Sequence, residues 1–166
     1  MPEHKTAIHL DMIFTQIDRG VCIVYPPHFL GPERLRILHW RKGDAQLREP
    51  ATFFEALREV DLKLEPARCG GEKRSLQDRE QWASGCNFAA MEPGVVLSYA
   101  RNEATLRELE SFGYHVVPAV AFLTGEARVK KDDKVVITFQ GSELVRGGGG
   151  PRCMSCPIER DPAGEA

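Results

Sequence analysis

The first organised part of the chain alternates between apolar and polar side chains. Between residues 8 and 15 every even-numbered position is apolar, and most odd-numbered positions are polar. A period of two is typical of a β-strand with one buried face. A polar turn at 18–20 then leads into a second apolar run at 21–25. The sequence therefore predicts a β-hairpin over residues 7–25.

Two polar side chains on the first predicted strand have chemical potential. His9 and Asp11 stand two positions apart, so on a strand they project from the same face. Histidine titrates near neutral pH, and a carboxylate can bind a cation. Polar residues on a strand face are also often simply solvated. The pair alone therefore leaves both interpretations open.

The segment that follows predicts a strand, a helix and a short strand. Apolar residues at 35–40 predict a third strand. Thr52 is placed to cap a helix over 53–60, because Glu55 stands three residues later, as in a capping box. Residues 62–64 predict a short strand after the helix.

The second half of the chain contains a similar series of elements. They are a short helix or turn at 75–84, a hairpin at 87–101 that turns at Pro93 and Gly94, a helix at 102–112 ended by Gly113, strands at 114–117 and 135–139, and a solvated loop at 125–134. The order of three strands, a helix and a further strand thus occurs twice, at about 7–64 and 86–139. This predicts a repeated α/β unit, not a doubly wound sheet. Such a repeat leaves a sheet face uncovered unless further units pack on it.

Composition excludes several classes of function. The net charge is −2 with both signs interspersed, so the sequence predicts neither a nucleic-acid-binding face nor a membrane-binding one. The chain has no apolar run long enough for a membrane span, and its polar opening is unlike a signal peptide. We therefore expect a cytoplasmic protein. Its five cysteines are an odd number at low density, so reduced thiols are expected, not a disulfide framework.

The stretch 141–157 is the strongest candidate for a site. Four consecutive glycines at 147–150 allow the backbone to approach a ligand closely, and Arg152 places a permanent positive charge beside the thiol of Cys153. The alternative is a flexible linker before the chain end. Cys153 and Cys156 also form a C-x-x-C pair. A zinc site would need a second Cys or His pair, and a redox dithiol should open a helix, so both interpretations are disfavoured.

Three stretches of the chain resemble the carboxy-terminal part of the arginine deiminase family. They are HLDMIFTQID at 9–18, REQWASGCNFAAMEPGVVLSYARNEATLRELESFGYHV at 79–116 and GSELVRGGGGPRCMSCP at 141–157. The resemblance implies the pentein fold of guanidine-modifying enzymes, an α/β propeller of five ββαβ modules. Residues 1–166 would supply about two modules and the carboxy-terminal segment with the catalytic cysteine.

The resemblance also implies an activity in arginine catabolism, the hydrolysis of L-arginine to L-citrulline and ammonia. Cys153 falls on the family's nucleophile, His9 on its catalytic histidine and Asp11 on a carboxylate that binds the guanidinium. Gly148, Gly149 and Arg152 fall in the substrate-binding loop around the nucleophile. The implied mechanism forms a covalent thiouronium on the cysteine, and it requires no metal and no organic cofactor. A thiolate suits attack on a guanidinium, and a carboxylate can hold this planar cation through two hydrogen bonds.

The chain departs from the family in ways that leave alternatives open. Family members carry a further aspartate, a glutamate and carboxylate-binding residues before the stretch at 9–18, and none of these can be located here. Gly148 stands where many members have an arginine that shields the empty site. We therefore expect a fragment that depends on a missing amino-terminal half or a second chain, with a homo-oligomer as one form of assembly. The other candidate functions are an amidinotransferase, a methylarginine hydrolase and a non-catalytic binding or assembly module.

Overall fold

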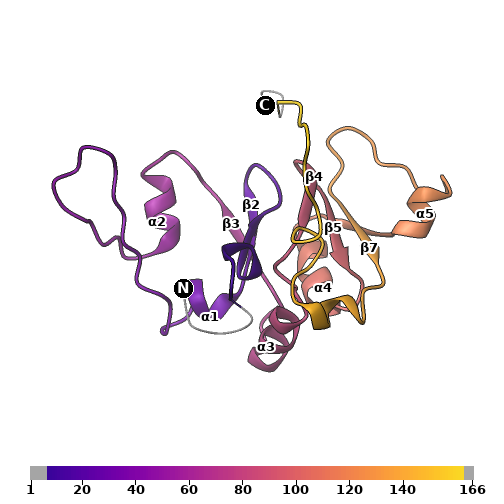
Figure 1. Ribbon diagram of the computed structural model, residues 1–166, viewed down its shortest axis with the longest axis horizontal. Helices are drawn as coiled ribbons and strands as arrows, with labels where there is room; N and C mark the ends of the chain where they lie inside the picture. The colour runs from indigo at the N-terminus through magenta and orange to yellow at the C-terminus, as the bar shows by residue number, and fades with distance from the viewer. Residues whose placement is uncertain (1–6, 163–166) are drawn as a thin grey trace.

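The chain folds as an α/β protein with two sheets (Figure 1), and the computed structural model describes residues 7–162. Residues 1–6, whose polar sequence is unlike a signal peptide, lie outside the described residues. The first sheet has the order β1 (Phe14–Gln16), β2 (Val21–Val24), β3 (Glu65–Arg68). Strand β1 is antiparallel to β2, which confirms the predicted hairpin in a shorter form, and β3 is parallel to β2.

The strand predicted over residues 8–15 is wrong before residue 14, where β1 begins. The chain instead makes a 3-10 turn, η1 (Leu10–Met12), in which the Met12 N–H donates to the His9 carbonyl at 3.1 Å. Met12 and Ile13 are consecutive and both buried. His9 and Asp11 stand in or beside this turn, where the side-chain alternation of a strand does not apply. His9 and Asp11 therefore do not share a strand face.

Two helices connect β2 to β3. The first is α1 (Pro26–Phe29), and the second is α2 (Phe53–Arg58). Helix α2 confirms the predicted cap, because the Glu55 N–H donates to Thr52 Oγ1 at 3.0 Å. The Glu55 carboxylate reaches back to accept the Ala51 N–H at 2.9 Å. Thr52 thereby satisfies one of the amide hydrogens that the first turn leaves unpaired, and Glu55 satisfies that of the residue before the cap.

Two further strand predictions in this region are wrong. Residues 35–40 form a loop, whose backbone makes a single bridge between His39 and Arg48. Leu38 and Trp40 are 61% and 59% exposed, so no sheet face within the described residues covers the apolar positions that suggested a strand. The strand expected at 62–64 begins at residue 65, where it pairs with β2. The first unit therefore has the order ββααβ, not the predicted three strands, a helix and a further strand.

The second sheet has the order β4-β5-β7-β6. Its strands are β4 (Ala89–Glu92), β5 (Val95–Tyr99), β6 (His115–Pro118) and β7 (Val135–Phe139). The predicted hairpin is confirmed by the antiparallel pair β4 and β5, and β7 lies parallel to both β5 and β6. The stretch 125–134 is a loop, as expected.

Three helices accompany this sheet: α3 (Arg74–Trp82), α4 (Glu103–Ser111) and α5 (Ala119–Leu123). The first two confirm the predicted helices, and Gly113 ends α4 with φ of +84°. Helix α5 was not predicted from the sequence. Within residues 7–162, none of the helices combines the length and the apolarity that crossing a bilayer requires.

The two sheets share one hydrophobic core. It joins Ile23 of the first sheet to Val96 and Val136 of the second, with Leu109 of α4 and Tyr114 between the elements. Helix α4 packs against β3 as well as β6. Burying a large apolar side chain contributes about 1.5–3 kcal/mol. Side chains of both halves therefore stabilise the same core.

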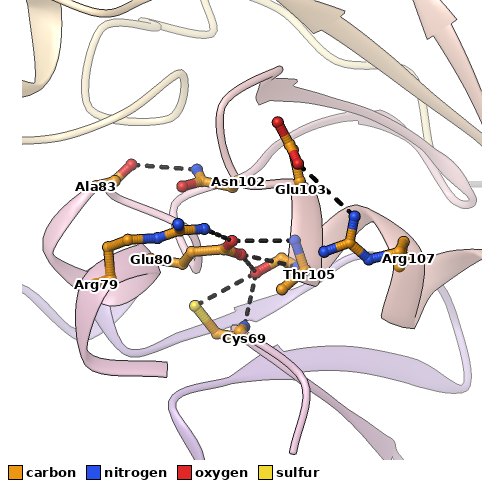
Figure 2. A network of polar contacts seen from close by, with 10 residues as sticks. Cys69, Arg79, Glu80, Ala83, Asn102, Glu103, Thr105 and Arg107 are labelled. Atoms are coloured by element: carbon orange, nitrogen blue, oxygen red, sulfur yellow. Dashed lines mark hydrogen bonds and ion pairs between the residues drawn. The ribbon is translucent and has the colours of Figure 1, made fainter. Parts of the chain in front are cut away.

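A buried carboxylate fixes α3 against the start of α4 (Figure 2). Glu80 is 1% exposed, and its side chain accepts the N–H of Ala104 at 3.0 Å and of Thr105 at 2.8 Å. It also accepts the Thr105 hydroxyl at 2.7 Å and an Arg79 N–H at 2.7 Å. A negative charge at a helix amino terminus is favourable, and here it comes from a different helix. The contacts of Glu80 with α4 therefore also hold the turn that follows α3, and this turn leads into the candidate active site.

Candidate active site

The loop that carries Cys153 is packed, unlike a flexible linker. After the 3-10 turn η2 (Leu144–Gly147), Gly148 and Gly149 take φ values of +80° and +88°, which side chains with a Cβ rarely adopt. A Cβ on Gly149 would stand 2.7 Å from Cys153 Cβ and 3.0 Å from its Sγ. Gly149 and Gly150 are buried. Glycine is therefore needed at 149 both for the backbone conformation and for the close approach to the thiol.

Asp11 lies beside Cys153, although 142 positions separate them in the sequence. Cys153 Sγ is 3.9 Å from Asp11 Oδ2, and Arg152 Nε is 3.5 Å from the same oxygen. The other oxygen, Oδ1, is buried and has no hydrogen-bond partner among residues 7–162. Buried carboxylate oxygens are normally paired. This one is an available acceptor next to a thiol.

The remaining predicted site residues, His9 and Gly148, make fewer contacts. His9 flanks η1 and is exposed, and within residues 7–162 no hydrogen bond or ion pair joins its ring to Cys153 or Asp11. Gly148 donates its N–H to the Val145 carbonyl at 3.1 Å. The structure thus brings Cys153, Asp11, Arg152 and Gly149 together, while the His9 side chain is exposed and makes none of these contacts.

Sequence reasoning missed Asn87. Its side chain is fully buried, and its Oδ1 accepts the N–H of Gly150 at 2.9 Å and of Cys153 at 3.1 Å. Its Nδ2 donates to the Asp11 carbonyl at 3.2 Å and to Cys153 Sγ at 3.2 Å. The signal in the sequence is an amide between Cys86 and Phe88 in an apolar run, because a polar residue buried there must find hydrogen-bond partners.

The five cysteines fall into a buried group and an exposed group. Cys22, Cys69 and Cys86 are fully buried, whereas Cys153 and Cys156 are exposed. Burial raises the pKa of Cys22 to about 12 and, together with the neighbouring Cys69, raises that of Cys86. The thiols of Cys22 and Cys86 are therefore unsuited to nucleophilic chemistry near neutral pH, and Cys69 is fully buried away from any reagent. Within residues 7–162, no group of three or more His, Cys, Asp or Glu side chains could hold a metal ion.

Comparison with known proteins identifies the family of the chain. The family model described as arginine deiminase matches residues 1–160. The chain is 35% identical over 161 residues to an arginine deiminase of Streptococcus agalactiae, a match that covers 95% of this chain and 34% of the relative. It is 33% identical over 171 residues to an arginine deiminase of Rhodococcus erythropolis, with 96% and 35% covered. The chain thus spans about a third of the length of these relatives. On these matches, the chain belongs to the arginine deiminase family.

Proposed function

We propose that this chain is the carboxy-terminal catalytic portion of an arginine deiminase, which hydrolyses L-arginine to L-citrulline and ammonia. The observation that carries the proposal is the contact between Cys153 Sγ and Asp11 Oδ2 at 3.9 Å, beside the unpaired Asp11 Oδ1. A soft nucleophile next to a carboxylate with a free acceptor suits a planar cation that has several N–H donors.

Asp11 is assigned the binding of the substrate guanidinium. The ion pair with Arg152 at 3.5 Å supports this role, because it shows the carboxylate already accepting a guanidinium of the chain itself. Two hydrogen bonds to one carboxylate fix the plane of a guanidinium. The guanidinium carbon is then held near the sulfur, which removes much of the entropic barrier to attack.

The reaction proceeds in two stages. The Cys153 thiolate attacks the guanidinium carbon and forms a C–S bond, and His9 as general acid protonates the amino group that leaves as ammonia. A thiouronium remains on Cys153. His9 then acts as general base and takes a proton from a water that attacks the same carbon, the C–S bond breaks, and citrulline and the thiolate are released. The second proton of that water goes to the ammonia, which leaves as ammonium, so atoms and charge balance with water as the co-substrate.

Gly148, Gly149 and Arg152 shape the site around the sulfur. The two glycines, with φ of +80° and +88°, let the backbone pass close to the bound substrate. Arg152 keeps a positive charge within the same cluster, and such a charge favours the thiolate.

The rest of the site comes from parts of the protein beyond this chain. In the proposed assembly the two sheets are two of five ββαβ modules around a central axis, and further carboxylates come from the other modules. The length of the chain supports this assembly, since the match covers only 34% of the arginine deiminase of Streptococcus agalactiae. We therefore expect these 166 residues alone to form little or no citrulline.

The test measures citrulline formed from L-arginine by the complete protein and by this chain alone. Cys153→Ala and His9→Ala are expected to reduce turnover by at least about a thousandfold, the order of effect seen when a nucleophile or its base is removed. Cys156→Ala, which removes the other exposed thiol, should leave turnover unchanged. Unaltered turnover in Cys153→Ala or in His9→Ala would refute the mechanism, and robust citrulline formation by the isolated chain would refute the proposed incompleteness.

The same assay separates the related enzymes. Arginine, dimethylarginine and agmatine are compared as substrates, and arginine is expected to react fastest. Preferred hydrolysis of dimethylarginine would indicate a methylarginine hydrolase. Transfer of the amidino group to an added amine, in place of hydrolysis, would indicate an amidinotransferase. Absence of any reaction in the complete protein would favour a non-catalytic binding module.

A further inference from the structure

The buried amide of Asn87 connects three separate parts of the site. Its Oδ1 accepts two backbone N–H groups, from Gly150 at 2.9 Å and from Cys153 at 3.1 Å. Two N–H donors can face only the oxygen of an amide, so the orientation of the Asn87 side chain is fixed by chemistry. The Nδ2 group therefore faces the Asp11 carbonyl and Cys153 Sγ, each at 3.2 Å.

We propose that Asn87 is a positioning residue for the nucleophile, holding the Cys153 loop through its oxygen and supporting the charged sulfur through its N–H. The proposal rests on the proposed function, in which Cys153 reacts as a thiolate. An N–H donor makes a stronger hydrogen bond to an anion than to a neutral acceptor. The Asn87 amide thus favours the form of Cys153 that attacks.

The charges around the sulfur make such a donor useful. Asp11 Oδ2 lies 3.9 Å away and opposes a second negative charge, while Arg152 pairs with that carboxylate at 3.5 Å. Tyr99 of β5 is also within electrostatic reach of Cys153, and its hydroxyl donates to Met154 Sδ at 3.9 Å. The pKa of Tyr99 is raised by burial and by the negative charge of Cys153. The Asn87 N–H is a neutral donor to the sulfur and does not depend on any of these ionisations.

The shape of the loop is matched to Asn87. A Cβ on Gly150 would lie 2.9 Å from Asn87 Oδ1 and 3.0 Å from its Cβ. The loop backbone therefore packs directly on the amide. On its other side, Asn87 follows a tight turn in which the non-glycine Ser84 has φ of +60° and its carbonyl accepts the Asn87 N–H at 3.0 Å. Such a conformation is uncommon for serine and is held by its surroundings.

The test uses Asn87→Asp and Asn87→Ala in this chain. The aspartate keeps the acceptor and the size, loses the donor and adds a negative charge, whereas the alanine loses both acceptor and donor and adds no charge. Alkylation by iodoacetamide is followed over a range of pH by mass spectrometry of the modified peptides. Cys156 is the reference thiol in the same molecule, because it is exposed and three positions away. Cys22, Cys69 and Cys86 report folding, because they are buried and react only if the chain opens.

Both variants are expected to lower the rate at Cys153 relative to Cys156 by about tenfold near neutral pH, and Asn87→Ala, which loses the donor without adding a charge, should also move the midpoint of the pH profile upward by about one unit. A purely structural role would not move the midpoint in Asn87→Ala. Asn102→Ala is the matched control. Asn102 is equally buried and donates to the Ala83 carbonyl at 3.1 Å, and its loss should leave the Cys153 to Cys156 ratio unchanged.

Two results would overturn the proposal. One is an unchanged ratio in a variant whose buried cysteines stay unlabelled. The other is labelling of the buried cysteines in both variants, which would assign Asn87 to the stability of the fold. Alkylation needs no substrate, so either result stands whether or not the protein converts arginine.

Discussion

Glu80 and Thr105 are joined by two hydrogen bonds to the same carboxylate oxygen. Glu80 Oε2 accepts the Thr105 N–H at 2.8 Å and the Thr105 hydroxyl at 2.7 Å (Figure 2). The carbonyl of Glu80 accepts the N–H of Gly85 at 2.7 Å, in the turn that leads to Asn87. A Cβ on Gly85 would lie 2.7 Å from that carbonyl oxygen. Glu80 therefore connects the start of α4 to the turn that leads to Asn87, which in turn contacts Cys153.

Replacing Glu80 is expected to destabilise the fold strongly. Glu80→Ala leaves the buried N–H groups of Ala104 and Thr105 without an acceptor, which should lower the free energy of unfolding by about 3 kcal/mol or more. Glu80→Gln keeps an acceptor and should cost less. Glu103→Gln is the control, because Glu103 is exposed and pairs with Arg107 only at 3.7 Å. Urea unfolding measures the free energy of unfolding of all three variants. A decrease of less than about 1 kcal/mol in Glu80→Ala would contradict this role.

Gly149 and Gly147 are expected to respond differently to alanine. Gly149→Ala forces a side chain into a left-handed conformation, at a cost of about 1–2 kcal/mol, and against Cys153. Its Cys153 should react with iodoacetamide more slowly, and its melting temperature should fall. Gly147→Ala has open space around its Cβ and should be tolerated. Equal behaviour of the two variants in both measurements would show that the loop does not constrain the thiol.

A cationic alkylating reagent should distinguish the two exposed thiols. Chloroacetamidine resembles a guanidinium, so Asp11 should direct it to Cys153 in preference to Cys156. Asp11→Asn should lose most of this preference, by about tenfold, while its reaction with the neutral iodoacetamide changes less. The peptides are quantified by mass spectrometry. Modification mainly at Cys156 would argue against Cys153 as the nucleophile.

The three tyrosines are expected to make the fold sensitive to alkaline pH. Burial raises the pKa of Tyr25 to about 12, with a contribution from its hydrogen bond to Asp78, and burial also raises the pKa of Tyr99 and Tyr114. The unfolded chain binds these protons less tightly, with a pKa of about 10. Stability is therefore complete below about pH 10 and is lost as the pH rises through about 12.

The ultraviolet absorbance of tyrosinate follows this transition. The native chain should show little tyrosinate until it unfolds, whereas the chain in urea should titrate near pH 10. Tyr25→Phe removes the hydrogen bond to Asp78, which should cost about 0.5–1.5 kcal/mol at neutral pH, and it should reduce the alkaline loss of stability. A native chain that ionises its tyrosines at the same pH as the unfolded chain would disprove the prediction.

Short-range signals in the sequence predicted much of the fold. The Thr52 cap with Glu55, the turn at 93–94 and Gly113 at the end of α4 depend on contacts within about four residues, and each is present in the structure. The strand expected at 35–40 is absent because its pattern was apolar but no neighbouring strand pairs with it. At η1 a 3-10 turn stands in place of the predicted strand, and the consecutive side chains of Met12 and Ile13 enter the core there.

The sequence by itself determined the hairpins, the capped helices and the thiol that follows the glycine run, because each depends on neighbouring residues. Only the tertiary structure decided that Asp11 would lie against Cys153 across 142 positions, and that Asn87 would hold the same loop across 66. These contacts exist because both sheets pack on one core and Glu80 fixes α3 to α4. Hydrogen bonds between such distant residues follow from that packing, which no local pattern contains.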